Sequence, residues 1–120
     1  MSETDGGDLL EREDIGDATV VRLNVPRLLD DETTNDLFRQ IYSIIDEEGR
    51  RKLVLNLQPL EYFASAALSK LVVLYRKARA AEARVALCNV TPTVASILQV
   101  THLADIMIAY NDEREALRSF

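Results

Sequence analysis

The stretch "LVLNLQPLEYFASAALSKLVVLYRKARAAEARVALCNV", residues 53–90, decides the fold class. It opens with a short, strongly apolar run, "LVLNLQPL", which is typical of a strand buried inside a sheet. Apolar side chains then recur at three- and four-residue spacing over 65–80, which predicts a helix that buries Leu68, Leu71, Val72, Tyr75 and Ala78. "RVALCNV" predicts a second strand. A strand, a helix and a strand in this order form a βαβ unit with parallel strands.

The residues on either side extend this unit into a larger sheet. "ATVVRLNV", residues 18–25, predicts a half-buried strand with Val21, Leu23 and Val25 on its inner face. A tight turn at Gly16-Asp17 joins it to a strand that begins near Asp8. The remaining patterns predict helices over 28–49, 91–100 and 111–120 and a last short strand over 105–110. The predicted fold class is therefore α/β: a single domain with a mixed, mostly parallel sheet of four to five strands, packed with about four helices.

Length, charge and cysteine content narrow the class of protein. The 120 residues suit one domain, expected over residues 8–120, preceded by a loose acidic tail over residues 1–7. Residues 1–17 hold seven acids and one base, so they account for the whole net charge of −6. This acidic balance, with no basic stripe, argues against a direct nucleic-acid partner. The sequence has no apolar run long enough to cross a membrane, no signal peptide and a single cysteine, Cys88, so we expect a cytoplasmic protein.

The chemistry-bearing residues do not favour an enzyme. His102 and Cys88 are the only histidine and cysteine, so a metal site rich in either cannot form. A Ser65–His102–acid triad can be written, but the glycine-x-serine-x-glycine elbow that usually carries such a serine is absent. The sequence also has no glycine-rich phosphate loop. We therefore expect no catalytic residue, no metal and no cofactor.

Ser65 lies where the strand region gives way to the second helix. Serine is a favoured N-cap residue, so we expect Ser65 to cap this helix. The equivalent residues expected to cap the other helices are Asp31 or Thr33, Thr91, and Asn111 or Asp112. The same place suits a regulated hydroxyl, because the free amides and positive dipole end of a helix N-terminus favour a phosphate. Physical arguments alone favour the cap.

Three ordered segments resemble the STAS domain of anti-sigma factor antagonists. "NVPRLLDDETTNDL" at 24–37 is similar to the family's G-x-L-D-x-x-T passage into its first helix. Residues 53–92 resemble its strand, F-x-D-S-S-G-L loop, helix and strand that ends near N-x-x-P. "ILQVTHLADIMIAYNDEREAL" at 97–117 is similar to its closing helix, T-G-L link, strand and terminal helix. The resemblance covers nearly the whole chain, from about Asp8 to Leu117.

The resemblance implies a mechanism and a partner. Antagonists of this family bind a kinase-type anti-sigma factor, a serine-protein kinase, and so release the sigma factor for transcription. The anti-sigma factor uses ATP to phosphorylate the second serine of the loop, which breaks the complex. By this resemblance the chain is a bacterial partner-switching regulator that acts by protein–protein contact, and its oligomeric state is left open.

The chain departs from the family at the loop itself. Aligning F-x-D-S-S-G-L with residues 62–68 places Ala64 at the aspartate, Ser65 at the first serine, Ala66 at the usual phosphoacceptor and Ala67 at the glycine. The protein then either binds its partner without being switched off, or accepts phosphate at Ser65, or serves as a divergent scaffold for another partner. Ser69 is a weaker acceptor candidate inside the helix.

We expect the partner to contact the loop and the first turns of the second helix. The residues of this expected surface are Tyr62, Phe63, Ala64, Ser65, Ala66, Ala67 and Ser69. Aromatic side chains beside small residues suit the core of an interface, although Phe63 is equally suited to burial. The alternative hypothesis is a ligand- or nucleotide-sensing STAS module, with its ligand near the same helix start.

Overall fold

The protein was analysed as a computed structural model, which describes residues 9–120; the expected tail over residues 1–7 lies outside the described residues. The predicted α/β class is confirmed. The elements, in chain order, are β1 (Leu10–Ile15), β2 (Ala18–Leu23), β3 (Arg27–Leu28), α1 (Glu32–Asp46), β4 (Lys52–Asn56), β5 (Tyr62–Phe63), α2 (Ser65–Ala80), β6 (Arg84–Cys88), α3 (Pro92–Val100), the short 3-10 helix η2 (Leu103–Asp105), β7 (Ala109–Tyr110) and α4 (Glu113–Arg118).

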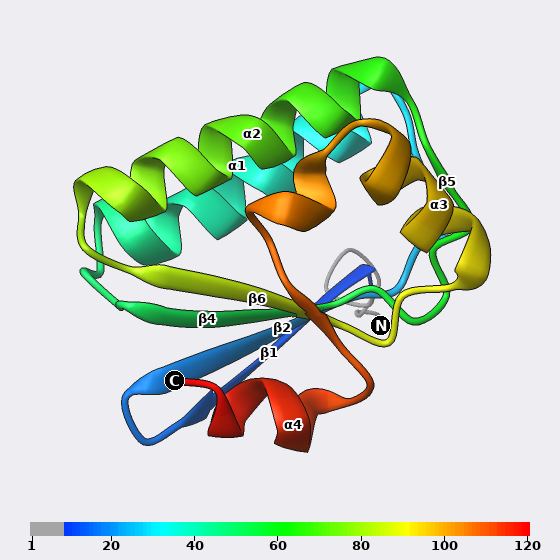
Figure 1. Ribbon diagram of the computed structural model, residues 1–120. Coiled ribbons are helices and arrows are strands. Elements are labelled where there is room, and N and C mark those ends of the chain that lie inside the picture. Colours follow the sequence, from blue (N-terminus) through cyan, green and yellow to red (C-terminus); the bar gives the residue numbers. More distant parts are fainter. Residues whose placement is uncertain (1–8) are drawn as a thin grey trace, which may run out of the picture.

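The main sheet is mixed and mostly parallel. Its five strands lie in the order β1-β2-β4-β6-β7, and only the β1–β2 hairpin is antiparallel. The hairpin turns at Gly16, whose φ of 61° suits glycine. Helices α1 and α2 lie over one face of the sheet with α3 at one end of them, and α4 lies against the opposite face (Figure 1).

The prediction that β2 is half-buried is wrong. Val20 and Val21 point to opposite faces of the sheet, and both have an exposed fraction of 0%. Val21 belongs to the large core beneath α1 and α2, whereas Val20 packs in a smaller cluster with Val54, Ala86, Cys88 and Ala116. Because Ala116 belongs to α4, this last helix covers the face that the sequence pattern left to solvent.

A partly buried ion pair fixes α4 to the sheet. Arg22 of β2 donates to both carboxylate oxygens of Glu113, at 2.7 and 2.8 Å. The Asn56 side-chain amide donates to Glu113 as well, at 2.7 Å. Hydrogen bonding from Arg22 lowers the pKa of Glu113, and the bond from Asn56 adds to this effect. The first residue of α4 is thus tied to β2 and β4, which lie far from it in sequence.

Helix α2 spans the residues predicted for it, but it faces the core at a different angle. Its buried residues are Ala67, Leu71, Leu74 and Ala78, while Leu68, Val72 and Tyr75 are only partly buried. The alanines at both ends of this stripe let the helix lie close to the sheet. The Tyr42 hydroxyl of α1 donates to the Lys70 carbonyl oxygen at 2.8 Å, which joins the two helices, and burial raises the pKa of Tyr42 to about 12.

The predicted strand over residues 105–110 forms only at its end. Residues 103–105 form η2, and only Ala109 and Tyr110 pair with β6. Met107 lies in the core with an exposed fraction of 1%, which holds this part of the chain away from the sheet edge. Ile106 and Ile108 are left exposed at 41% and 58%.

Candidate functional site

The loop before α2 is fastened to the rest of the domain by its backbone. Strand β5 pairs in parallel with β3, an addition to the fold that the sequence pattern did not predict. The Ala64 amide donates to the Leu28 carbonyl oxygen at 2.8 Å, and the Glu61 amide donates to that of Pro26 at 2.8 Å. The Thr91 hydroxyl donates to the Leu60 carbonyl oxygen at 2.9 Å. The start of α2 is therefore presented by a framework of hydrogen bonds rather than by a free loop.

The expectation that Ser65 caps α2 is wrong. Ala64 is the N-cap residue, with φ −75° and ψ 159°, and its carbonyl oxygen accepts the Leu68 amide at 3.1 Å. Ser65 is the first helical residue, and α2 has no side-chain cap. In the other α-helices described here, Asp31, Thr91 and Asp112 each accept a backbone amide through the side chain. Thr91 was the predicted cap of α3, and Asp31 and Asp112 were each one of two predicted alternatives. Among the described α-helices, α2 therefore begins at an N-cap residue whose side chain cannot accept a hydrogen bond.

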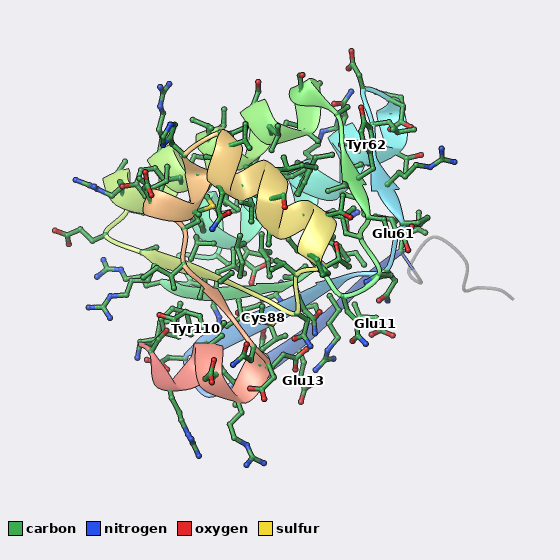
Figure 2. All side chains as sticks on the ribbon, turned by 45° about the vertical axis from the view of Figure 1, so that its right-hand side comes forward. Glu11, Glu13, Glu61, Tyr62, Cys88 and Tyr110 are labelled. Carbon is green, nitrogen blue, oxygen red and sulfur yellow. The ribbon has the colours of Figure 1, made fainter. Side chains whose placement is uncertain are left out.

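The seven predicted contact residues divide into buried and accessible ones. Phe63 and Ala67 lie in the core, with exposed fractions of 3% and 0%. Tyr62 points the other way from β5 and is 49% exposed, beside the start of α2 (Figure 2). Ser65 and Ser69 are exposed, and Ala64 and Ala66 are partly exposed. These five accessible residues, Tyr62, Ala64, Ser65, Ala66 and Ser69, are called the α2-start surface below.

The two serines of the α2-start surface differ in their hydrogen bonding. The Ser69 hydroxyl donates to the Ser65 carbonyl oxygen one turn earlier, at 3.2 Å. The Ser65 hydroxyl makes no hydrogen bond to another group within residues 9–120 and is exposed at the first turn. Of the two, Ser65 therefore has the hydroxyl that is freer to react.

An exposed apolar patch on α3 was missed by the sequence analysis. Val100 is 80% exposed and lies with Ser96, Ile97 and Thr101 around a shallow hollow of about 240 Å³. The helical periodicity of α3 places Val100 on the side that faces solvent. An apolar residue at such a position could have indicated this patch.

Cys88 and His102 are the single cysteine and the single histidine of the chain. Cys88 is buried in β6, and burial raises the pKa of its thiol to about 12 (Figure 2). His102 is exposed, and its Nδ1 lies 3.4 Å from a carboxylate oxygen of Asp105. Among the described residues, no group of three or more histidine, cysteine, aspartate or glutamate side chains is arranged to hold a metal ion. The candidate site therefore consists of the α2-start surface and the Ser65 hydroxyl.

A polar hollow of about 430 Å³ lies where β2 and β4 end. It is lined by Arg22, Asn24, Asn56, Gln58 and Pro59. Arg22 and Asn56 are already engaged by Glu113, and the Asn56 side-chain oxygen accepts the Gln58 amide at 3.0 Å. Because Arg22 and Asn56 already form these bonds, the hollow gives little support to a ligand-sensing site.

The family model described as the STAS domain matches residues 10–116. The chain belongs to the STAS domain family. Over 74 residues it is 26% identical to a Bordetella bronchiseptica protein, BtrV, whose name assigns it to the anti-sigma factor antagonists; the match covers 62% of this chain and 64% of BtrV.

Solved structures share the fold of this STAS domain. An anti-sigma factor antagonist domain from Planctomyces limnophilus has a TM-score of 0.81 and 23% identity, over 92% of this chain and 96% of that one. The Bacillus protein SpoIIAA, an anti-sigma factor antagonist in its unphosphorylated form, has a TM-score of 0.70 and 17% identity, over 92% and 94%. At this identity the likeness concerns the fold. No helix in residues 9–120 is long and apolar enough to cross a membrane.

Proposed function

We propose that this anti-sigma factor antagonist-like STAS domain binds a kinase-type anti-sigma factor through the α2-start surface, in partner-switching control of transcription. The observation that carries the proposal is the composition of that surface. A half-exposed tyrosine stands beside Ser65 and two alanines, on a loop held in place by backbone hydrogen bonds. A rigid aromatic anchor next to small side chains suits the centre of a protein interface.

The names of similar proteins support this assignment. BtrV and the Planctomyces limnophilus protein are both named as anti-sigma factor antagonists. SpoIIAA has been solved in unphosphorylated and in phosphorylated forms. Phosphate addition is therefore a property of a protein with this fold, and the loop of the present chain is where such a switch would act.

The chain is proposed to lack the usual switch, because Ala66 stands at the acceptor position. Its methyl group is partly exposed at the second position of α2 and offers no oxygen. A kinase docked on the α2-start surface would therefore meet the Ser65 hydroxyl one residue earlier. If Ser65 is not in register with the kinase, the antagonist stays bound and keeps its partner sequestered. The chain itself acts by binding, without a cofactor.

The proposal is tested with a panel of purified kinase-type anti-sigma factors. Each is mixed with the protein in the presence of ATP, and complex formation is followed by gel filtration while added phosphate is followed by intact mass. We expect a stable complex with one member, weakened at least tenfold in Tyr62→Ala, as for loss of an interface anchor. Phosphate that disappears in Ser65→Ala would assign the displaced acceptor. Absence of a complex with every member contradicts the proposal.

A further inference from the structure

The sheet has an unfilled edge on β6. Strand β6 spans five residues, but β7 pairs only with Leu87 and Cys88. The hydrogen bonds show how the β6 backbone alternates: the Arg84 amide donates toward β4, to Arg51, and the Leu87 amide donates toward β7, to Ile108. The Val85 amide and carbonyl must therefore face the β7 side, where β7 is absent. One strand addition site is left open beside Arg84–Ala86.

A groove runs along this open edge. It has a volume of about 300 Å³ and is bordered by α2 on one side of the sheet and by the segment around α4 on the other. Its apolar lining comes from Tyr75, Ala78, Ala83, Val85, Ala86, Ile106, Ile108, Tyr110 and Phe120. Tyr110 lies between the sheet and α4 (Figure 2). An extended chain laid on the edge would thus place alternate side chains on apolar surface.

The rim of the groove is positively charged. Arg79 and Arg84 line it, and neither forms an ion pair with a carboxylate among residues 9–120. The Arg79 guanidinium donates to the Tyr75 hydroxyl at 2.8 Å and lies 5.8 Å from the centre of its ring, which fixes one charge at the edge. Arg84 shares the α4 face of β6 with Ala86, whereas Arg79 belongs to α2 on the opposite face, so acidic side chains at alternate positions of an added strand would meet Arg84.

We propose that the edge of β6 at Arg84–Ala86 binds an extended segment of a partner protein, with alternating acidic and apolar residues, by β-strand addition. The chain's own segment 105–110 does not fill the edge, because Met107 is held in the core. The opposite sheet edge of a second copy fits poorly, since β1 is mostly charged and Ile15 is its exposed apolar residue. Three residues of strand span about 10 Å, so the added strand is short.

This groove is distinct from the α2-start surface. Ser65 and Arg79 lie fourteen residues apart on one helix, which separates them by about 21 Å. The proposal does not rest on the proposed function: a partner can occupy the β6 edge whether or not an anti-sigma factor binds the start of α2.

The test uses the full chain labelled with nitrogen-15 and two capped hexapeptides, one of alternating glutamate and isoleucine and one of alternating lysine and isoleucine. In the free protein the Val85 amide should exchange quickly with solvent, unlike that of Ala86. The glutamate peptide should shift the resonances of Arg84–Ala86 saturably and slow the exchange of the Val85 amide. Arg84→Glu should weaken this binding about tenfold and favour the lysine peptide instead.

Substitution at Val85 separates the backbone contact from the apolar one. Val85→Pro removes the outward amide, which takes part in no ladder bond, so the sheet should tolerate it while peptide binding falls at least fivefold. Val85→Ala keeps the amide and should bind nearly as the wild type does. The proposal is overturned by slow exchange of Val85 in the free protein, by equal binding of both peptides, by shifts that map elsewhere, or by concentration-dependent self-association through this edge.

Discussion

Installing a cap at the start of α2 is expected to stabilise the protein. Ala64 has the extended backbone of an N-cap residue, is partly exposed and has no side chain that accepts a hydrogen bond. Ala64→Asp supplies the acceptor at the position where the family pattern has aspartate. A cap contributes about 1 kcal/mol and a negative charge at the helix dipole about 0.5 kcal/mol, so the free energy of unfolding should rise by about 1.5 kcal/mol.

The increase is measured by urea unfolding and by thermal unfolding followed with circular dichroism. For a chain of this size 1 kcal/mol corresponds to roughly 4 °C, so Tm should rise by roughly 6 °C. Ala64→Asn is the matched control, because it caps without charge and should gain about 1 kcal/mol. Ser65→Ala should change stability by less than about 0.5 kcal/mol, since Ser65 is not the cap.

The pH dependence gives an independent check. Asp31, which caps α1, has its pKa lowered chiefly by the hydrogen bond from the Thr34 amide. An aspartate at 64 should be affected in the same way, so its stabilisation is complete above an unfolded-state pKa of about 3.9 and is lost as the pH falls through the lower folded-state value. A neutral or destabilising Ala64→Asp, or a loss above about 1 kcal/mol in Ser65→Ala, would refute the assignment of the cap.

Four further substitutions test contacts that hold the fold together. Tyr42→Phe removes a hydrogen bond to a carbonyl oxygen of α2 and should lower the free energy of unfolding by about 1 kcal/mol in urea; an unchanged midpoint would contradict it. The bond from Arg22 keeps the pKa of Glu113 below its ordinary value of 4.5, so this carboxylate stabilises the fold above about pH 4.5 and loses that effect as the pH falls through its folded-state pKa. Urea midpoints between pH 6 and 3 should therefore fall less steeply in Glu113→Gln than in the wild type, and parallel curves would argue against it. Phe63→Ala should lower the free energy of unfolding by about 3–5 kcal/mol, and Tyr62→Ala should lower it by less than about 0.5 kcal/mol. Similar losses in the two variants would contradict the difference in burial between these rings.

Short sequence patterns predicted the features that depend on neighbouring residues, such as helix limits and helix caps. The limits of α2 follow from helical spacing, and the starts of α1, α3 and α4 follow from residues that can accept a first-turn amide. The burial of both faces of β2 was not predictable in this way, because it depends on α4. The Arg22–Glu113 pair that holds α4 in place joins residues 91 positions apart. The β3–β5 pairing involves two residues in each strand, too few for a periodic pattern.

The site was located by resemblance, and its detail was decided by backbone geometry. Tyr62 and Phe63 are adjacent aromatics, and only the direction of β5 decides that the first is exposed and the second is buried. The cap was assigned to Ser65 because serine is a good cap residue. The chain instead enters the helix one residue earlier, with the Ala64 amide bonded to the Leu28 carbonyl oxygen of β3. That contact comes from a strand pairing that the sequence pattern did not contain.

We have proposed that this protein binds a kinase-type anti-sigma factor through a surface at which Ala66 replaces the phosphoacceptor. Restoring the hydroxyl tests it most directly. The wild type and Ala66→Ser are each incubated with the anti-sigma factor that binds the wild type and with ATP, then resolved by gel filtration and weighed by intact mass. We expect Ala66→Ser to gain one phosphate and to leave the complex, while the wild type, which has no hydroxyl at residue 66, stays bound. Failure of Ala66→Ser to accept phosphate within a complex that does form would contradict it.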